Sequence, residues 1–388
     1  LEAVLHIKGP LMIIAGAGSG KTRVLTYRIA YLLKAKNVDP FKVLALTFTN
    51  KAANEMKERV AHMVGPKARS MWVSTFHSAC VRILRNEAKR LNLKPSFTIY
   101  DTQDSVRMLS LVSKDLGIDP KSYSPKYLLG QISNLKNELI DYEDAISKAV
   151  TAQEQTVAQA YGEYQRRLML ASAVDFDDLI GLPLKLLQQH EPVRQRWQSM
   201  MGHVLVDEYQ DTNATQYELL QLLVGGQPAA SARFTAVGDD DQSIYGWRGA
   251  DITNITGFER HFPEPTIIKL MENYRSQRPI LETANAVIRH NAGRREKQLI
   301  ATTAGTEPVR LVSMPGDAEE AEFVINEIWT ANTVHRRPWE DFAILFRANA
   351  QSRLFEEALR KQSIPYRILG GQSFFERREV KDILSYLN

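Results

Sequence analysis

The chain has 388 residues, with 49 Lys and Arg against 45 Asp and Glu, and its formal net charge is +4. Hydrophobic residues make up 44% and charged residues 24%, which excludes a disordered or collagen-like chain. The single cysteine, Cys80, excludes an internal disulfide framework and a cysteine-based zinc site, so we expect a reducing, cytosolic setting. No apolar run approaches the ~20 residues of a membrane span. A charge of +4 does not by itself indicate a nucleic-acid partner.

Strand-like runs alternate with helical patterns in the first part of the chain. This alternation predicts parallel βαβ units, in which helices cover the sheet. The expected strands are residues 11–14, 43–48 and 72–75, and the expected helices are residues 22–34, 51–64 and 77–91.

The pattern changes between residues 95 and 189, which are rich in Leu, Lys, Gln, Glu and Tyr at helical spacing. We therefore expect a helical insertion there. Strand-like runs return after it, and Pro263 and Pro265 mark a boundary before a second α/β unit. The later expected strands are residues 203–207, 234–238, 266–270, 309–313, 342–346 and 366–369.

A glycine-rich loop, AGAGSGKT, follows the first expected strand. It fits the pattern G-x-x-x-x-G-K-[ST] except at Ala15, where Ala is tolerable if its φ is negative. In such a loop, backbone N–H groups and the start of the next helix face phosphate oxygens. Lys21 would contact the β- and γ-phosphates, and the Thr22 hydroxyl would ligate Mg²⁺. The alternative is a plain strand-to-helix turn. The expected nucleotide-binding residues are Ala15, Gly16, Ala17, Gly18, Ser19, Gly20, Lys21 and Thr22.

Two adjacent carboxylates, Asp207 and Glu208, follow the apolar run at residues 203–206. Open parallel sheets bind ligands at the carboxyl ends of their strands. Asp207 would hold Mg²⁺, directly or through water, and Glu208 would orient and deprotonate the attacking water. Alone, a solvated strand end explains this pattern equally well. Together with the glycine-rich loop, it predicts hydrolysis of a nucleoside triphosphate.

Further segments resemble superfamily 1 DNA helicases of the Rep/UvrD/PcrA type, in family order along essentially the whole chain. Within that family the closest look is to Rep-like members. The matching segments are DEYQDTN at residues 207–213, GDDDQSIYGWRGA at 238–250, ENYRS at 272–276, LTFTNKAA at 46–53, STFH at 74–77, VDFDDL at 174–179, RANAQSR at 347–353 and GGQSFF at 370–375.

The resemblance implies an ATP-dependent motor that walks 3′ to 5′ on single-stranded DNA and unwinds duplexes in replication or repair, in the bacterial cytosol or nucleoid. It implies an α/β fold: a P-loop RecA-like parallel-sheet motor domain with an all-helical insertion, plus part of a second RecA-like domain. The expected partners are ATP, Mg²⁺, single-stranded DNA and its junctions with duplex, and no membrane; self-association and repair-protein partners stay open. The expected boundaries are residues 1–88 and 188–268 for the first motor domain and 89–187 for the insertion. Residues 269–388 are expected to be the N-terminal part of the second domain, running into the start of a second insertion.

The resemblance also adds residues to the nucleotide site, while the loop and the two carboxylates keep the roles given above. Gln242 would sense the γ-phosphate, and Arg275 would act as an arginine finger. Arg23 and Tyr274 would sandwich the adenine ring. Outside the motif context, a surface salt bridge would explain Arg275 and core packing would explain Tyr274.

The family's DNA track is expected where aromatic and polar residues follow the strands, because bases stack on rings and polar groups hold phosphates. For Phe48 a core role is the alternative, and for His77 a hydrogen-bonded packing role. The expected DNA-binding residues are Phe48, Thr49, Asn50, Lys51, Thr75, His77, Tyr245, Trp247, Arg248 and Asn349.

Two charged features fit this track less directly. The carboxylates of residues 239–241 would repel DNA, so we expect them to face Mg²⁺–ATP or to make turn and cap hydrogen bonds. Basic clusters at residues 82–94 and 289–297 would either bind the phosphate backbone or form solvated helix faces.

The chain also departs from the family pattern. No Gln precedes the first strand to read adenine, and the later family motifs, including a second arginine for the γ-phosphate, do not appear. We therefore expect the N-terminal portion of a longer helicase. The alternatives are a nucleotide- and DNA-binding fragment without turnover, the motor part of a helicase–nuclease, and a motor that acts on RNA.

Overall fold

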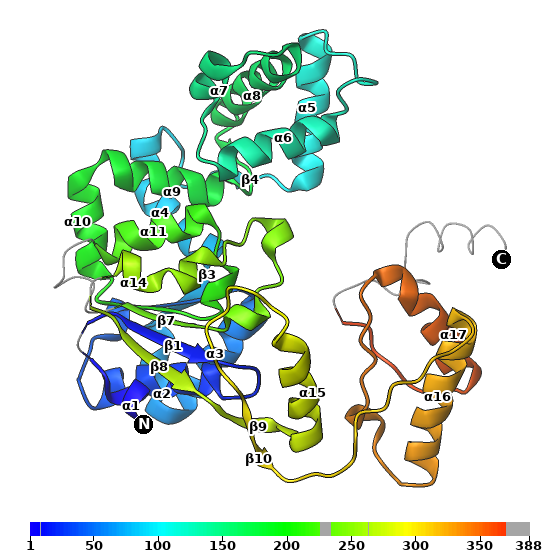
Figure 1. Cartoon of the computed structure of the whole chain (residues 1–388). Helices are drawn as coiled ribbons and strands as arrows, with labels where there is room; N and C mark the ends of the chain where they lie inside the picture. The colour runs from blue at the N-terminus through cyan, green and yellow to red at the C-terminus, as the bar shows by residue number, and fades with distance from the viewer. Residues whose placement is uncertain (8, 226–233, 263, 370–388) are drawn as a thin grey trace. The chain divides into compact units, whose positions relative to one another are not determined.

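The computed structural model describes residues 1–7, 9–225, 234–262 and 264–369 (Figure 1). The chain divides into two compact units, Leu1–Pro308 and Val309–Asn388, and each is described by itself. Among the described residues, none of the helices combines the length and the apolar character needed to cross a membrane.

The first unit is organised by a six-stranded parallel sheet with the order β3-β2-β6-β7-β1-β8. The four inner strands, β2, β6, β7 and β1, are mostly buried, as expected for a parallel sheet with helices on both faces. All six strands were predicted from their apolar runs. Their bounds are β1 Leu11–Ala15, β2 Val43–Thr47, β3 Trp72–Thr75, β6 His203–Val206, β7 Phe234–Gly238 and β8 Thr266–Leu270.

Alternate residues of the strands supply two separate cores, one on each face of the sheet. Leu11 and Ile13 of β1 pack with α1, α2 and α3 on one face, while Met12 and Ile14 pack with α4, α9, α10 and α11 on the other. These helices are α1 Glu2–Leu5, α2 Lys21–Lys34, α3 Asn50–Val64, α4 Phe76–Glu87, α9 Asp178–Gln189, α10 Glu191–Met200 and α11 Ala214–Val224.

The predicted helical insertion has a hydrophobic core of its own, centred on Leu109, Ile132 and Tyr164. Its helices are α5 Thr102–Asp115, α6 Pro125–Asn137, α7 Tyr142–Lys148 and α8 Ala152–Leu170. The structure adds a parallel strand pair that the sequence did not predict: β4 Thr98–Ile99 lies against β5 Ala173–Val174. Such two-residue strands are too short to give a hydrophobic period.

A buried charge cluster ties α6 of the insertion to the start of α9. Lys136 Nζ lies 2.7 Å from Asp175 Oδ2 and 2.8 Å from Asp178 Oδ1. The hydroxyl of Tyr164 donates to Asp175 at 3.1 Å. Burial opposes the charged form of Lys136, but Asp178 and Asp175 outweigh it, so the pKa of Lys136 lies above its ordinary value.

The rest of the first unit follows β7. It contains α13 Thr253–Thr256, α14 Phe258–His261, β9 Glu272–Gln277, α15 Arg278–Ile288 and β10 Ile300–Thr303. Strand β9 pairs with β10 in parallel. The 3-10 turns of this unit are Pro40–Lys42, Pro66–Ser70, Ala88–Leu91, Tyr209–Asp211, Asp240–Gln242 and Gly246–Arg248. The domain boundaries given above stay predictions; β8 spans the expected one at residues 268 and 269.

The second unit contains α16 Asp317–Thr333 and α17 Ser352–Lys361, with 3-10 turns at Trp339–Asp341 and Asn349–Gln351. The strands predicted at residues 309–313, 342–346 and 366–369 were wrong for the part of this unit that is described, which forms no strand. Residues 342–346 do alternate between half-buried and exposed side chains, as a strand would. An alternating pattern does not supply the hydrogen-bonded neighbour that a strand also needs.

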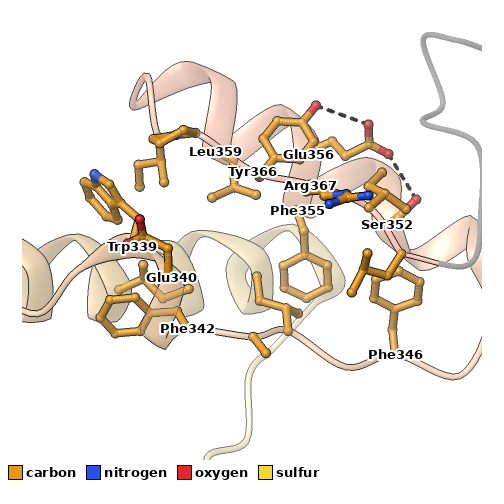
Figure 2. A pocket seen from close by; sticks show the side chains of 17 residues that line it. Trp339, Glu340, Phe342, Phe346, Ser352, Phe355, Glu356, Leu359, Tyr366 and Arg367 are labelled. Carbon is orange, nitrogen blue, oxygen red and sulfur yellow. Dashed lines mark hydrogen bonds between the residues drawn. The ribbon is translucent and has the colours of Figure 1, made fainter. Parts of the chain in front are cut away.

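A cavity of about 550 Å³ lies within this second unit (Figure 2). Trp339, Phe342, Phe346 and Phe355 are among the side chains that line it. Among its lining residues, the Glu356 carboxylate accepts hydrogen bonds from the Ser352 hydroxyl at 3.1 Å and from the Tyr366 hydroxyl at 3.3 Å. The lining is largely apolar, so the cavity belongs to the core of the unit.

Candidate functional site

The chemistry-bearing segments of the first unit meet at the carboxyl edge of the sheet. The glycine-rich loop follows β1, the Asp207–Glu208 pair follows β6, and the acidic turn at residues 239–241 follows β7. Because β6, β7 and β1 are neighbours in the sheet, these three segments come side by side. This is the edge at which parallel α/β sheets bind ligands.

The loop adopts a conformation that depends on two of its glycines. Gly18 has φ +71° and Gly20 has φ +94°, backbone angles that residues with a side chain rarely adopt. Gly20 is also the N-cap of α2. The Ser19 hydroxyl donates to the Gly16 carbonyl at 2.7 Å and closes the turn. Ala15 is the buried last residue of β1 and has no positive φ, as the departure from the motif required.

Lys21 lies at the first turn of α2 and points at the residues after β6 and β7. Its Nζ donates to Glu208 Oε2 at 2.8 Å and to Gln242 Oε1 at 3.1 Å. The side chain of Lys21 is only 10% exposed, whereas that of Glu208 is 35% exposed. A phosphate anion at this helix terminus could therefore exchange for the carboxylate as the partner of Lys21.

Asp207 is buried beside Thr22 and Glu208. Its backbone N–H donates to the Leu46 carbonyl at 2.9 Å, which extends the pairing between β6 and β2. Burial, followed by repulsion from Glu208, raises the pKa of Asp207 to about 6, against smaller opposing effects that include a hydrogen bond with Thr22. A hydroxyl and a carboxylate are the oxygen donors that Mg²⁺ prefers, so Thr22 and Asp207 fit the predicted metal role.

The carboxylates of residues 239–241 surround the ammonium group of Lys297. Lys297 Nζ lies 2.7 Å from Asp239 Oδ1 and 2.9 Å from Asp241 Oδ2, and it also contacts Asp240. Asp239 accepts from the Asp241 N–H as the N-cap of its 3-10 turn, which confirms the predicted turn and cap hydrogen bonds. Arg294 makes a bidentate pair with Asp241 at 2.8 and 2.7 Å.

These contacts change the interpretation of the basic cluster at residues 289–297. Arg294 and Lys297 pair with the acidic turn, and Arg295 pairs with Glu259. Burial alone would raise the pKa of Asp241, but hydrogen bonds from Arg294 and Lys297 outweigh it and hold that pKa below its ordinary value. These three cations therefore have internal partners, which contradicts a solvated face for them. Their contact with DNA stays a prediction.

Strand β9 hydrogen-bonds to the glycine-rich loop. Asn273 Nδ2 donates to the Ala17 carbonyl at 2.5 Å, and the Tyr274 N–H donates to the Gly18 carbonyl at 3.0 Å. Asn273 Oδ1 in turn accepts from the N–H groups of Arg275 and Ser276 at 2.9 and 2.8 Å. The approach is close, since a Cβ on Gly18 would lie 2.6 Å from the Arg275 Cβ.

The Cβ of Arg275 therefore lies beside the glycine-rich loop, as an arginine finger requires, and the Arg275 side chain is exposed. The Tyr274 ring is 58% exposed, so core packing does not explain it. Arg23 is also exposed, and its guanidinium lies 5.6 Å from the centre of the Tyr27 ring. The predicted adenine-stacking pair is therefore near the loop and accessible, with Tyr27 as an aromatic neighbour that the sequence did not single out.

Three predicted DNA-binding aromatics form a chain of rings after β2 and β7. Phe48 stacks on Tyr245 with ring centres 5.1 Å apart, and Tyr245 lies 6.4 Å from Trp247. Trp247 is 69% exposed and Phe48 is half-buried, so the core alternative for Phe48 does not describe its position. Single-stranded bases stack on accessible aromatic rings, and Trp247 is the exposed end of this row.

Polar members of the predicted track lie at the starts of two helices. Thr49 caps α3 by accepting from the Ala52 N–H, and Thr75 caps α4 by accepting from the Ser78 N–H. Asn50 and Lys51 are exposed in the first turn of α3. Both threonines therefore have a structural role that is independent of DNA.

His77 packs against Phe176 of the segment VDFDDL, with ring centres 4.3 Å apart. Burial lowers the pKa of His77, so its neutral form is favoured. Phe176 itself is 58% exposed. This ring pair supports both a packing role for His77 and a place on the track.

The remaining predicted residues are placed less fully. Asn349 lies at the start of a 3-10 turn in the second unit and is exposed. Arg248 ends the 3-10 turn Gly246–Arg248, and its side chain is outside the described parts, as is the segment GGQSFF. Sequence reasoning missed Gln210, Asn273 and Lys297, although two of them lie within matched motif segments.

Two comparisons with known proteins bear on this site. The model of the UvrD/REP helicase N-terminal domain matches residues 1–263, and that of the UvrD-like helicase C-terminal domain matches residues 268–388. The chain belongs to the UvrD/REP helicase family. It resembles the ATP-dependent DNA helicase PcrA of Staphylococcus aureus, at 49% identity over 386 residues, and that of Staphylococcus epidermidis, at 48%.

Both matches cover 100% of this chain but 52% of the relative, so the chain spans about half the length of these family members. The family assignment confirms the resemblance inferred from the motifs and the RecA-like α/β class. Both relatives are PcrA proteins, and the finer likeness to Rep-like members stays a prediction.

Proposed function

We propose that this chain carries the ATPase motor of a DNA helicase that moves 3′ to 5′ on single-stranded DNA and unwinds duplexes at junctions during replication or repair. One observation carries the proposal: the phosphate-binding loop, the paired carboxylates and the chain of rings that ends at the exposed Trp247 follow adjacent strands of one sheet. A nucleotide site and a base-stacking surface that share a sheet edge can respond to each other. The relatives' printed name, ATP-dependent DNA helicase, supports the same function.

At the nucleotide site, ATP would displace Glu208 from Lys21, because Lys21 opens the helix that directly follows the loop and its partner Glu208 is 35% exposed. Thr22 and Asp207 would hold Mg²⁺, which would neutralise charge on the β- and γ-phosphates. Glu208, once released, would orient the attacking water and take its proton. Arg275 would stabilise negative charge that builds up on the transferring phosphoryl group.

Gln242 offers the link from this chemistry to the DNA surface. Its amide contacts Lys21 on one side, and Tyr245 and Trp247 follow it in the same loop. A change in the contact between Gln242 and the γ-phosphate would move the backbone that carries both rings. Bases stacked on these rings would then shift with each cycle of hydrolysis. We place this activity in the bacterial cytosol or nucleoid.

Steady-state ATP hydrolysis, measured with and without single-stranded DNA, tests the proposal. We expect stimulation by DNA, weaker stimulation by RNA, and a loss of about 100-fold or more in Lys21→Ala, the size seen when one charge-stabilising donor is removed. Lys34→Ala, an exposed lysine at the end of the same helix, is the matched control. A basal rate that DNA leaves unchanged would contradict the motor, and the absence of hydrolysis would favour the nucleotide- and DNA-binding fragment without turnover. Movement on strands labelled at either end would test the 3′ to 5′ direction.

A further inference from the structure

A closed ring of hydrogen bonds joins three segments: the residues after β6, the turn after β7 and the end of the glycine-rich loop. Lys21 Nζ donates to Glu208 Oε2 at 2.8 Å, and Gln210 Nε2 donates to the same oxygen at 2.9 Å. The Asp239 N–H donates to Gln210 Oε1 at 3.0 Å. Gln242 Nε2 donates to Asp239 Oδ2, and Lys21 returns to Gln242 Oε1 at 3.1 Å. Gln210 is the member of this ring that has no role so far.

The amide of Gln210 is held in one orientation. The side chain is 1% exposed, and its oxygen must face the backbone N–H of Asp239, which can only donate. Its NH₂ group therefore faces Glu208. A Cβ on Gly238 would lie 2.6 Å from this oxygen, so the glycine leaves the space that Gln210 occupies.

The far side of the ring is also fixed. Asp239 contacts Gln242 through one carboxylate oxygen and Lys297 through the other, at 2.7 Å. The backbone before Gln210 is unusual as well, since Glu208 has φ +51° and opens the 3-10 turn Tyr209–Asp211. This turn brings Gln210 back toward the carboxylate of Glu208, two positions earlier.

We propose that Gln210 is the positioning residue for Glu208. The inference rests on the proposed ATPase, in which Lys21 turns from Glu208 to a phosphate. The carboxylate then keeps the Gln210 hydrogen bond, which fixes the oxygen that faces the attacking water. Since Gln210 also accepts from Asp239, the position of Glu208 follows the turn that carries Gln242.

Two substitutions separate the halves of this role. Gln210→Met keeps the length of the side chain and removes both hydrogen bonds. Gln210→Glu keeps an oxygen for the Asp239 N–H but replaces the donor beside Glu208 with a second carboxylate. We expect both to lower kcat for DNA-stimulated hydrolysis by about 10- to 100-fold, the usual range for residues that orient a catalytic group. ATP affinity should change by less than about 3-fold, because neither variant alters the loop.

A double variant tests whether Gln210 acts through Glu208. Glu208→Gln should slow turnover strongly, and adding Gln210→Met should slow it no further, because the group to be positioned has already lost its role. Gln216→Met is the matched control: this buried glutamine caps α11 and should leave kcat unchanged. Three results would each overturn the proposal. The kcat losses of the two single variants could multiply in the double variant, ATP affinity could fall as much as kcat, or Gln210→Glu could keep the wild-type rate.

A wild-type chain without ATPase activity would contradict the proposed function, but it would leave the hydrogen bond between Gln210 and Glu208 untouched. In that case urea midpoints of Gln210→Met, Glu208→Ala and the double variant test it without turnover. We expect the two shifts to be non-additive, since both remove the same hydrogen bond. Additive shifts would overturn the inference.

Discussion

The insertion and the nucleotide site each bury a lysine, and the comparison shows what separates a structural charge from a functional one. The side chain of Lys136 is 6% exposed and that of Lys21 is 10% exposed, so the lysines themselves barely differ. Their partners do: Asp175 and Asp178 are 4% and 7% exposed, whereas Glu208 is 35% exposed. An incoming anion can replace Glu208 but cannot reach the partners of Lys136.

The two clusters also differ in how well their charges are matched. Lys136 pairs with two carboxylates, and its pKa lies above that of a free lysine. In the nucleotide site, burial and the neighbouring Glu208 outweigh the favourable contacts of Asp207, and the pKa of Asp207 is raised to about 6. The insertion thus matches its buried charges with one another, while the candidate nucleotide site holds a buried carboxylate whose charged form is disfavoured.

The largest expected effect breaks the insertion's cluster. Lys136→Met should lower the free energy of unfolding by about 3–5 kcal/mol, because it leaves two buried carboxylates without a cation. Lys21→Met, the matched change in the nucleotide site, should cost less than about 1 kcal/mol because Glu208 can turn to water. Urea unfolding followed by circular dichroism gives both values. Equal losses in the two variants would contradict the contrast in partner exposure.

A second, smaller effect should have the opposite sign. Asp207 binds its proton more tightly when folded, so the folded state loses stability as pH rises from about 3.8 to about 6. Asp207→Asn should therefore raise the free energy of unfolding at pH 7.5 by about 2–3 kcal/mol, and the gain should shrink toward zero near pH 4. Thermal unfolding at the two pH values measures it. A gain that is the same at both would show that the charge of Asp207 is not its cause.

The smallest expected effect concerns the exposed rings beside the nucleotide site. Trp247→Ala should weaken binding of single-stranded DNA by about 1–3 kcal/mol, the value of one stacked base. Because Trp247 is 69% exposed, its loss should change stability by less than about 0.5 kcal/mol. Trp197→Ala, at a side chain 2% exposed, is the contrasting control and should reduce stability more than DNA binding. Fluorescence anisotropy with a labelled oligonucleotide decides, and unchanged affinity would remove Trp247 from the track.

The sheet and most of the site were predictable because their signals are local. Strands buried on both faces carry uninterrupted apolar runs, and the phosphate loop needs glycines, a lysine and a threonine at fixed spacing. The three runs in the second unit show the limit of this reasoning. Residues 342–346 have the alternation of a strand, but hydrogen bonding requires a neighbour that the pattern does not encode.

The missed residues depend on contacts between distant segments. Asn273 reaches the loop carbonyl of Ala17 across 256 positions, and Lys297 pairs with carboxylates more than 50 positions earlier. Gln210 lies in a motif that was matched, yet its amide acquires a role only when Asp239 is placed beside it. Composition and spacing report residue types, whereas these roles come from tertiary geometry.

The short strand pair at the base of the insertion has an evolutionary consequence. Strand β4 precedes and β5 follows the four helices of the insertion, and the two strands are neighbours, so the chain returns to within about 4.8 Å of where it left. An element whose ends are adjacent can be lengthened, exchanged or lost without changing the register of the six-stranded sheet. Such a change would leave the strands that carry the glycine-rich loop and the paired carboxylates in place.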